Sequence, residues 1–281
     1  MNKEIGIVVV LYKPNKDHLN NVLNLAKAFR VYVIDNSEDS CTISHTNMDY
    51  IPLYENKGIA FAQNVGIKRM QTERFEYVLF LDQDSRISSD QILQLKDDYE
   101  FIYHTIDENI GCVSPTIINE DTGIGYKSHE RMTSSFTRQQ FVISSGMLIP
   151  VNVICKIGYV CEGLFIDFVD HELCFRLKEY GYSIYSTNKV CLKHKIGNGA
   201  FFFLGQEIIV SKPFRYYFKY RNFIWLIKTK YIPYTWKIKS SILLLLEVLC
   251  ILFDSHYKNI RRDVLRNLFK GIKDGIKQKC M

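Results

Sequence analysis

The chain has 281 residues, of which 47% are hydrophobic and 23% are charged, with 15 glycines and 6 prolines. This composition excludes a disordered or fibrous chain and supplies enough apolar residues for one large domain, or for one domain with an appendage. No stretch has about 18 consecutive apolar residues, so we expect no membrane-spanning helix. Eight cysteines show no Cys-x-x-Cys spacing, which disfavours a zinc site and a disulfide framework.

The net charge of +6 hides a division along the chain. Residues 1–210 contain 20 Lys and Arg against 26 Asp and Glu, whereas residues 211–281 contain 16 against 4. The second part therefore carries a net charge of +12. An excess of this kind suggests an anionic partner for the C-terminal part, either a membrane surface or a nucleic acid.

Two kinds of apolar segment alternate along residues 1–210. Short continuous apolar runs predict buried strands, and apolar residues spaced three and four apart predict helices. The predicted elements are a strand at 5–11, a helix around 19–26, strands at 31–34 and 51–54, a helix at 59–67, a strand at 77–81, a helix at 89–104, a strand at 110–118, an interrupted strand at 141–150, a helix from about 170 and a strand after 182. This alternation indicates an α/β fold with a mixed, mostly parallel sheet flanked by helices.

Two turns in the first part carry residues that suit a nucleotide. Asp35 ends the strand at 31–34 and could accept hydrogen bonds from a nucleoside, although an Asx-turn is the commoner reason for a lone aspartate there. Gly58 lies at the start of the next helix, where free backbone N–H groups suit a phosphate. The segment lacks the Gly-x-Gly-x-x-Gly pattern, so no dinucleotide fold is predicted.

The segment 77–85 (YVLFLDQDS) combines a buried strand with two carboxylates. Asp82 and Asp84 stand at the carboxyl end of that strand, where open α/β sheets bind ligands. Alternate residues of an extended segment face the same way, so both carboxylates could meet one cation. Mg²⁺ commonly binds such carboxylates together with substrate phosphates, which predicts a metal–diphosphate site. The alternative is a chance Asp-x-Asp that caps the helix beginning near Ser89.

Two later segments are predicted to lie near the same site. Residues 119–139 are polar, rich in Gly, Ser, Thr and Arg, and without periodicity, which predicts a mobile loop. The strand at 141–150 is interrupted by Ser144, Ser145 and Gly146. Glycine within a strand often marks a bulge or the close approach of a ligand, so we expect one of these at the interruption.

A second acidic stretch spans residues 164–177 (LFIDFVDHELCFRL). The acidic and imidazole side chains at the start of its predicted helix are Asp167, Asp170, His171 and Glu172. Three carboxylates within six residues, among aromatic side chains, suit a general base held in a cleft. The alternative is that acidic residues at a helix N-terminus only interact favourably with the helix dipole. Farther on, His194 follows a short apolar strand, where a lone histidine is more often structural than a ligand.

The C-terminal part, residues 211–281, is predicted to be helical and basic. The apolar run at 242–253 is too short to span a bilayer and is interrupted by Glu247. Beyond it, apolar residues recur every four residues from Ile260 to Ile276, with Arg and Lys on another face. Such a basic amphipathic helix is typical of segments that lie in the membrane interface. The alternatives are a helix docked on the core, which applies equally to 242–253, and a nucleic-acid-binding surface.

Several motifs, in this order and spacing, resemble those of the family 2 glycosyltransferases of GT-A fold, and among them the bacterial rhamnosyltransferases of polysaccharide assembly. They are VVVLYKP, VIDNS, ENKGIAFAQNVGI, FLDQDS, ISSGMLIP, FIDFVDHELCFRLKEYGY, LKHKIG and RYYFKYRN, within residues 5–225. The resemblance implies a GT-A nucleotide-diphospho-sugar transferase domain at 1–210. A helical, membrane-associating extension would follow at 211–281.

The resemblance also implies roles for individual residues of the donor site. Leu11 and Asp35 would hold the nucleoside. Asp82 and Asp84 would bind a Mg²⁺ or Mn²⁺ ion that bridges the two phosphates, and His194 matches a late histidine that can complete the metal site. The remaining donor-binding residues implied by the matching motifs are Lys57, Asn64, Gln83, Ser145 and Gly146.

The catalytic base implied by the resemblance is Asp170. It matches the aspartate of a Glu-Asp pair that takes this role in the family, but Val169 stands here in place of the glutamate. This departure leaves open whether Asp167 or Glu172 assists. The implied reaction is a single inverting displacement, in which Asp170 takes the proton of an acceptor hydroxyl.

The implied activity is transfer of L-rhamnose from dTDP-β-L-rhamnose to a lipid-linked oligosaccharide in the synthesis of a bacterial surface polysaccharide such as O-antigen. The enzyme would be cytoplasmic, peripheral on the inner face of the cytoplasmic membrane, and would bind no nucleic acid; whether it forms a homo-oligomer stays open. Another UDP- or dTDP-sugar donor fits the same residues. From other classes, a metal-dependent nuclease or nucleotidyltransferase could use Asp82, Asp84 and Asp170, and a non-catalytic binding module could use the basic part alone.

Overall fold

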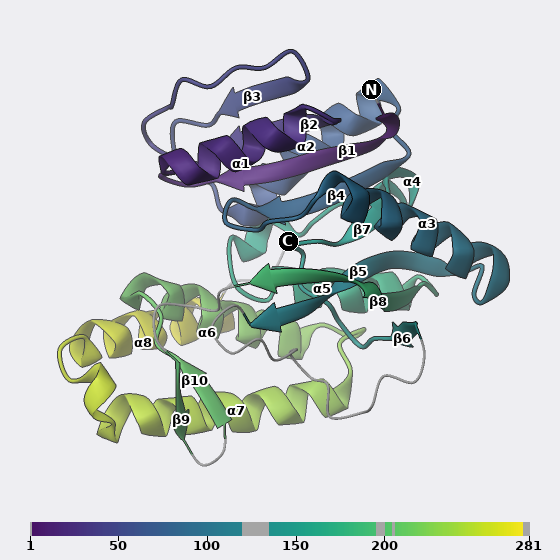
Figure 1. Cartoon of the computed structure of the whole chain (residues 1–281). Helices are drawn as coiled ribbons and strands as arrows, with labels where there is room; N and C mark the ends of the chain where they lie inside the picture. The colour runs from purple at the N-terminus through teal and green to yellow at the C-terminus, as the bar shows by residue number, and fades with distance from the viewer. Residues whose placement is uncertain (1, 120–134, 195–199, 204–205, 278–281) are drawn as a thin grey trace.

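The computed structural model describes residues 2–119, 135–194, 200–203 and 206–277. An eight-stranded sheet forms its centre, and helices cover both faces of the sheet (Figure 1). The strands are β1 (Asn2–Leu11), β2 (Phe29–Asp35), β3 (Met48–Pro52), β4 (Tyr77–Asp82), β5 (Ile110–Asn119), β6 (Phe136–Arg138), β7 (Leu148–Pro150) and β8 (Ser183–His194), with a separate hairpin of β9 (Ala200–Phe203) and β10 (Gln206–Ile209).

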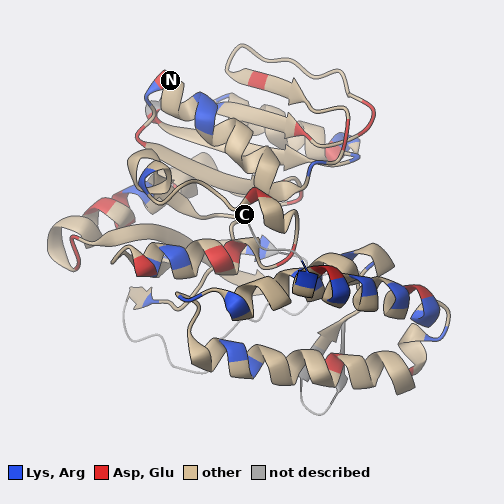
Figure 2. Cartoon of the chain, turned by 180° about the vertical axis from the view of Figure 1, so that it is seen from behind, with Lys and Arg blue, Asp and Glu red and all other residues tan. Residues whose placement is uncertain are grey.

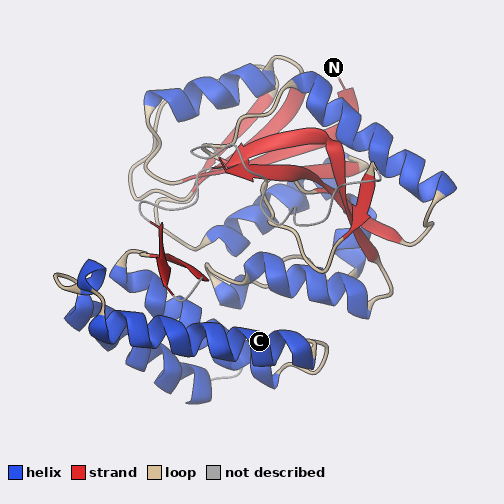
Figure 3. Ribbon diagram, turned by 60° about the horizontal axis from the view of Figure 1, so that its bottom comes forward, coloured by secondary structure: helices blue, strands red, loops and turns tan. Residues whose placement is uncertain are grey.

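The helices fall into two groups. Five accompany the sheet, namely α1 (Lys16–Ala26), α2 (Ile59–Glu73), α3 (Ser89–Thr105), α4 (Val151–Lys156) and α5 (Val169–Glu179). Three belong to the C-terminal part, namely α6 (Pro213–Lys228), α7 (Tyr234–Phe253) and α8 (Arg261–Lys277), with short 3-10 turns η1 (Glu162–Leu164) and η2 (Ser255–Tyr257) elsewhere. The C-terminal helices lie together at one side of the sheet (Figure 3).

The strand order is β3-β2-β1-β4-β7-β5-β8-β6. The pairs β1–β2, β1–β4, β2–β3 and β5–β8 are parallel, whereas β7 pairs antiparallel with β4 and β5, and β6 with β8. The predicted mixed, mostly parallel sheet is therefore confirmed. Because β1, β2 and β4 run the same way, their carboxyl ends meet at one edge, the place where open α/β sheets bind ligands.

The core explains why β1 is continuously apolar from Ile7 to Leu11. Successive side chains of a strand point to opposite faces of the sheet. Val8 packs with Ala60, Ile67 and other residues of α2 on one face, whereas Ile7 and Val9 pack with residues of α1 and α3 on the other. A strand covered by helices on both faces has no solvated side, so the hydrophobic run is continuous rather than alternating.

Two predicted segments differ from the structure. Residues 141–147 are not a strand, and only Leu148–Pro150 pairs in the sheet, because the chain turns at Ser144 with a hydrogen bond of 3.0 Å from the amide of Met147 to its carbonyl. Of the predicted loop at 119–139, residues 120–134 lie outside the described residues. Phe136–Arg138 forms β6, which pairs with β8.

The C-terminal part is helical, and the structure shows how its last helix packs. The segment expected to lie in the membrane interface is α8, but its apolar face packs against α6 and shares a core with Tyr216, Tyr220 and Phe223. The alternative of a docked helix is therefore the right one for α8. The apolar run at 242–253 belongs to α7, and none of the described helices is both long enough and apolar enough to cross a membrane.

Candidate active site

Three of the predicted site residues meet at the carboxyl edge of the sheet because of strand register. Leu11 lies opposite Asp35 between β1 and β2, and Val10 lies opposite Asp82 between β1 and β4. The Leu11 side chain is fully buried, and its carbonyl accepts a hydrogen bond of 2.8 Å from the amide of Asn36. Leu11 therefore packs in the core beneath this edge, and Asp35 and Asp82 stand on either side of the end of β1.

Asp35 is buried and oriented by the protein. Its carboxylate accepts hydrogen bonds from the amide of Ser37 (3.0 Å) and from the hydroxyl of Tyr50 (2.6 Å), and the thiol of Cys41 lies 3.6 Å away. Burial, followed by the neighbouring Asp35 carboxylate, raises the pKa of Tyr50, so this phenol remains a donor at neutral pH. The carboxylate at the end of β2 is thus fixed in place, as a group that recognises a ligand must be.

The turn after β4 is held from two sides. The backbone amide of Asp82 donates to the hydroxyl of Ser145 at 3.1 Å, and that hydroxyl lies 2.6 Å from the hydroxyl of Ser85. On the other side, the side-chain carbonyl of Gln83 accepts a hydrogen bond of 2.9 Å from the amide of Tyr12, in the loop after β1. Asp84 is exposed at the tip of this turn.

Gly146 accounts for the interruption predicted in the segment 141–150. Its φ of +86° lies in the region that glycine adopts readily, and a Cβ there would lie 2.6 Å from Cγ of Pro115. Its amide donates to the carbonyl of Phe80 at 2.7 Å. The interruption therefore brings the hydroxyl of Ser145 to the backbone amide of Asp82. In the described structure, Ser145 and Gly146 thus support the turn after β4.

The end of β8 lies beside the same turn. Arg86 forms an isolated antiparallel bridge with Lys193, and the side-chain amide of Gln91 donates to the carbonyl of Cys191 at 3.2 Å. The backbone of His194 is therefore adjacent to the turn that carries Asp82 and Asp84, although its side chain lies outside the described residues. Among the described side chains, no three metal-ligating groups converge. Two carboxylates at this edge nevertheless fit a hard divalent cation that also binds phosphate oxygens.

The segment before α2 contacts the end of β2. The side-chain amide of Asn36 donates to Asn56 at 3.0 Å, and its carbonyl accepts from the amide of Lys57 at 2.8 Å. The ammonium of Lys57 pairs with Glu55 at 2.8 Å and lies 5.1 Å from the ring centroid of Phe61. Lys57 thus stands next to Asn36, the residue that follows Asp35, and carries the positive charge of this segment.

Asn64, predicted to bind the donor, makes hydrogen bonds within the protein. It is buried in α2, and its side-chain amide donates to the carbonyl of Val160 and to the carboxylate of Glu162, both at 2.8 Å. Its side-chain carbonyl accepts from the amide of Val160 at 2.9 Å. Because these contacts use both ends of the amide, Asn64 ties α2 to the segment before α5, and we leave it out of the proposed donor site.

Asp170 lies in the first turn of α5 with its side chain a quarter exposed (25%). Its carboxylate accepts a hydrogen bond of 2.9 Å from the backbone amide of His171 and lies 3.1 Å from Nδ1 of that residue. Burial raises the pKa of Asp170, but the hydrogen bonds and charge of His171 outweigh it and hold the pKa below its ordinary value. Asp170 is therefore ionised at neutral pH and able to accept a proton.

The other two carboxylates of this stretch are already paired. Asp167 accepts hydrogen bonds of 2.5 and 3.3 Å from the guanidinium of Arg215 in α6. Glu172 is buried, and it accepts two hydrogen bonds from Arg176 (2.7 and 2.9 Å) and one from the hydroxyl of Tyr231 (2.5 Å). A carboxylate held by a guanidinium is a poor proton acceptor, so Asp170 is the better candidate for the base.

The backbone that leads into α5 is strained. Phe165, Asp167 and Phe168 all have φ near +65°, which costs non-glycine residues about 1–3 kcal/mol each. Asn222 of α6 holds this backbone, because its side-chain amide lies within 2.9 Å of the carbonyls of Leu164, Ile166 and Asp167. Strain of this kind persists only where surrounding contacts enforce it, and it places Asp170 at the start of α5.

A second residue of α6 supports the same backbone. The guanidinium of Arg221 donates to the carbonyl of Gly163 at 2.7 Å and to the side-chain carbonyl of Asn222 at 2.8 Å. Sequence reasoning did not assign a role to either residue. The only signal in the sequence was their place at the end of the motif RYYFKYRN.

Contacts connect this strained segment, residues 163–168, with the carboxyl edge of the sheet. The carbonyl of Phe165 accepts a hydrogen bond of 2.8 Å from the amide of Ile59, at the start of α2. On the other side, the ring of His171 packs on Phe141 with centroids 4.2 Å apart, and Phe141 precedes Ser145 in the segment that supports Asp82. The start of α5 is thus connected through Phe165 to α2 and through His171 to the segment that supports Asp82.

We expect His171→Phe to move the acid limb of the pH–rate profile upward. Phenylalanine keeps the ring packing on Phe141 but removes Nδ1, so the carboxylate of Asp170 loses its main stabilising partner while its burial remains. The pKa of Asp170 then rises, and activity is lost at a higher pH as the pH falls. A profile of kcat against pH measures this shift. His104→Phe, on the exposed end of α3, is the control, and an unchanged profile for His171→Phe would contradict the pairing.

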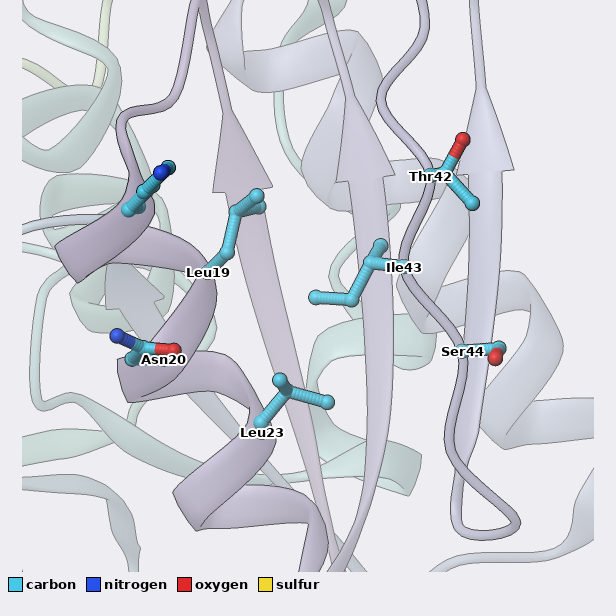
Figure 4. A pocket seen from close by; sticks show the side chains of 7 residues that line it. Leu19, Asn20, Leu23, Thr42, Ile43 and Ser44 are labelled. Carbon is cyan, nitrogen blue, oxygen red and sulfur yellow. The ribbon is translucent and has the colours of Figure 1, made fainter.

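A separate groove of about 320 Å³ lies between α1 and the loop that follows β2 (Figure 4). Leu19 and Leu23 of α1 face Ile43 across it. Its remaining lining residues are Lys16, Asn20, Thr42 and Ser44. None of these is a predicted site residue, so the groove plays no part in the site described above.

Comparison with known proteins bears on the fold and on the class of enzyme. No protein-family model matches the chain. It is 28% identical to a dTDP-rhamnosyl transferase of Shigella flexneri over 98% of both chains. It is also 26% identical to a hexosyltransferase of low-salt glycan biosynthesis from Haloferax volcanii, over 66% of this chain and 64% of the relative.

Solved structures share the fold at low sequence identity. S. aureus TarS (residues 1–349) in complex with UDP-GlcNAc matches with a TM-score of 0.56 and 16% identity, over 98% of this chain and 81% of that chain. GalNAc-T7 with UDP, GalNAc and Mn²⁺ matches with a TM-score of 0.52 and 12% identity, over 72% of this chain and 44% of that chain. The resemblance drawn from the motifs is thereby confirmed, and the chain is a glycosyltransferase of GT-A fold, similar over nearly its whole length to a bacterial rhamnosyltransferase.

Proposed function

We propose that the protein transfers L-rhamnose from dTDP-β-L-rhamnose to a hydroxyl of a lipid-linked oligosaccharide during synthesis of a bacterial surface polysaccharide. The observation that carries this proposal is the similarity to a dTDP-rhamnosyl transferase along 98% of both chains. The site supports it, because each part of the reaction has a candidate group. Asp35 at the end of β2 would bind the nucleoside, Asp82 at the end of β4 and Asp84 in the following turn would serve the diphosphate through a cation, and the ionised Asp170 would serve the acceptor hydroxyl.

The donor would bind along the carboxyl edge of the sheet. Asp35 would accept hydrogen bonds from the base or the ribose, since its carboxylate is already oriented by Ser37 and Tyr50. The diphosphate would lie over the turn that carries Asp82 and Asp84. Lys57 stands next to Asn36, the residue after Asp35, and would add positive charge for the phosphates. The backbone amides of Lys57, Gly58 and Ile59 already donate to Asn36, Asn56 and Phe165, so the contribution of this segment would come from its charge.

Asp82 and Asp84 would hold a Mg²⁺ or Mn²⁺ ion, with His194 as a further ligand. When bound, such an ion neutralises the charge that develops on a departing nucleoside diphosphate. The Mn²⁺ in the GalNAc-T7 structure supports this proposal for the shared fold. The support of Asp82 by Ser145 and of Gln83 by Tyr12 would keep the turn in one conformation before the donor arrives.

Asp170 would take the proton of the acceptor hydroxyl as that oxygen attacks the anomeric carbon from the face opposite the diphosphate. One displacement of this kind inverts the anomeric centre, so a β-L-rhamnosyl donor gives an α-L-rhamnosyl product. Asp167 and Glu172 are bound by Arg215 and Arg176, and they would hold the segment around α5 rather than share the proton transfer.

The enzyme would work as a peripheral protein on the inner face of the cytoplasmic membrane. A lipid-linked acceptor has its sugar at the bilayer surface, so an enzyme that docks there meets it directly. The net charge of +12 in residues 211–281 supports this location, because the cytoplasmic leaflet is anionic. The same residues would form the membrane-associating part beside the catalytic part at 1–210.

A donor panel measured by calorimetry tests the proposed donor and metal together. We expect dTDP-L-rhamnose to bind with Mn²⁺ and to bind at least about tenfold more weakly without it, because the cation bridges carboxylates and diphosphate. In Asp84→Ala, binding should lose this dependence on Mn²⁺, whereas Asp90→Ala, a similarly exposed aspartate in the next helix, should keep it.

Three outcomes of the panel would correct the proposal. Metal-dependent binding of a UDP-sugar or GDP-mannose in place of dTDP-L-rhamnose would keep the mechanism and discard the rhamnosyl donor. Binding of dTDP-L-rhamnose that ignores both Mn²⁺ and the Asp84→Ala change would discard the metal site. Absence of binding across the panel, together with salt-sensitive binding to DNA, would favour a nuclease or nucleotidyltransferase.

A further inference from the structure

A stripe of exposed apolar side chains runs along one side of α7. Its residues recur three and four apart, which places them on a single face of the helix. The opposite face of α7 is buried through Leu244, Cys250 and Ile251. The stripe, called here the α7 stripe, consists of Tyr234, Ile238, Ile242, Leu245, Leu249, Leu252 and Phe253. Tyr234 and Phe253, at its two ends, are 79% and 81% exposed.

The α7 stripe is more extended than an ordinary exposed surface requires. Single exposed apolar residues are common on soluble proteins, but a contiguous row of seven along one helix marks an interaction surface. A helix of 20 residues is about 30 Å long, so the row extends over most of one side of the C-terminal part. Aromatic residues at both ends suit the boundary between lipid and water.

The neighbouring helix α8 offers no equivalent surface. Its apolar residues Val264 and Leu268 are buried against α6. Gly271 and Gly275 let the two helices touch, since a Cβ at Gly275 would lie 2.9 Å from the carbonyl oxygen of Arg221. What α8 exposes is mainly charge, and Figure 2 shows Lys and Arg repeated along it.

The charge of this part of the chain indicates what covers the stripe. Residues 211–281 carry a net charge of +12, and Lys237 and Lys239 flank Ile238 on either side of the stripe. A second copy of the chain would bring the same positive charge to the contact. An anionic lipid surface is complementary to it, because it accepts apolar side chains between headgroups and attracts basic residues.

The N-terminal end of α7 packs directly beside the candidate base. The indole of Trp236 lies 5.9 Å from the ring of His171, 5.6 Å from Phe168 and 5.6 Å from Phe175, measured between ring centroids. His171 in turn holds Asp170. Because Tyr234 and Ile238 lie two residues on either side of Trp236, the stripe starts within one helical turn of this contact.

We propose that the α7 stripe seats the enzyme on an anionic lipid bilayer, with α7 lying flat in the interface and the entrance to Asp170 held at the membrane surface. This inference rests on the proposed function in one respect, since a place for Asp170 at the membrane surface serves catalysis only if the acceptor is lipid-linked. It assigns the contact to α7 within residues 211–281, where the sequence alone suggested the segment that forms α8.

Co-flotation of the full chain with vesicles tests the inference. Vesicles of phosphatidylglycerol and phosphatidylcholine in equal parts should carry the protein, and vesicles of phosphatidylcholine alone should carry less of it. Leu245→Glu/Leu249→Glu should lower binding at least about tenfold, because two exposed apolar groups of the stripe can no longer enter the bilayer. Phe269→Glu/Ile276→Glu, two exposed apolar residues of α8, is the matched control and should change binding less than about threefold.

The outcomes separate the candidates for this surface. A loss confined to the α8 variant would overturn the inference in favour of α8. Unchanged vesicle binding with a change from dimer to monomer in the α7 variant, measured by light scattering, would overturn it in favour of a second copy. A wild-type chain that does not float would also overturn it. Calorimetric binding of dTDP-L-rhamnose, measured on the same samples, would show whether the proposed function survives, and circular dichroism would show that both variants are folded.

Discussion

Replacing Asp170 by asparagine should lower kcat by about 10²–10⁴-fold, the usual contribution of a general base. Asparagine has nearly the same shape and can keep the contact with the amide of His171, but it cannot take a proton from the acceptor hydroxyl. Binding of the donor nucleotide should stay within about threefold of wild type, since Asp170 lies on α5 and not on the strands that carry Asp35 and Asp82. Single-turnover kinetics and calorimetry measure the two effects separately.

Asp90→Asn is a matched control for this change. Asp90 is, like Asp170, an acidic residue in the first turn of a helix, but it belongs to α3 and is exposed. Its replacement should leave kcat unchanged. If Asp170→Asn retained more than about a tenth of the wild-type kcat, the carboxylate would not be the base, because a lost proton acceptor costs more than that.

The paired carboxylates near Asp170 should behave differently. Glu172→Gln leaves the largely buried guanidinium of Arg176 without its anionic partner, which destabilises the folded state. Such a variant would be less stable, and its kcat would follow the fraction that is folded. The contrast between Asp170 and Glu172 therefore distinguishes a group that reacts from a group that holds the structure.

The strands around the site could be predicted because they are covered on both faces. The runs at 5–11, 31–34 and 77–81 are continuous in apolar residues, and a buried strand is the simplest structure that such runs can form. The segment 141–150 is equally apolar at its ends, but Gly146 and the hydrogen bond from Met147 to Ser144 turn the chain there. A local pattern does not show which side of a glycine will pair in the sheet.

For the C-terminal helices, the spacing of apolar residues predicts a helix but does not show what its apolar face contacts. The wheel of α8 separates apolar from basic residues, and a helix that docks on protein and one that docks on lipid produce the same pattern. In the structure α8 docks on protein, because Gly271 and Gly275 let it pack against the backbone of α6. The helix that is exposed, α7, is apolar around much of its circumference, and its sequence gave no clear apolar face.

The positions that could be predicted from the sequence are those at the carboxyl ends of the strands. Asp35 and Asp82 follow from the topology, since parallel strands bring their carboxyl ends to one edge. Asn64 was predicted to bind the donor from its place in a motif, but an amide in a motif can serve the fold as well as a ligand. Its hydrogen bonds to Val160 and Glu162, which the sequence does not reveal, show that it holds α2 to the segment before α5. Asn222 was not predicted to matter, because it lies 52 positions after Asp170 and its partners are backbone carbonyls, which no sequence motif reveals.

Asn222→Ala should lower both kcat and stability. The change removes the donor that lies within 2.9 Å of the carbonyls of Leu164, Ile166 and Asp167. The carbonyl of Leu164 keeps the guanidinium of Arg221 and the amide of Ile166 as donors, whereas loss of the donor to the other two carbonyls costs about 2–4 kcal/mol in total. With its constraint gone, the strained backbone at Phe165 and Phe168 can relax, and α5 then starts in a different place. A displacement of about 1 Å at a reacting group can cost about 10²-fold in kcat.

The expected signature of Asn222→Ala is a fall in kcat with an unchanged dissociation constant for the donor, measured well below the melting temperature of the variant. Tyr220→Phe is the matched control, because Tyr220 is a buried residue of the same helix whose hydroxyl donates to Leu244 and Glu247 of α7. Tyr220→Phe should lose stability of similar order, about 1–2 kcal/mol, and keep its kcat. Equal kcat values for the two variants would mean that Asn222 serves only to fold the chain. A selective loss in Asn222→Ala would mean that α6, outside the sheet, sets the position of the base.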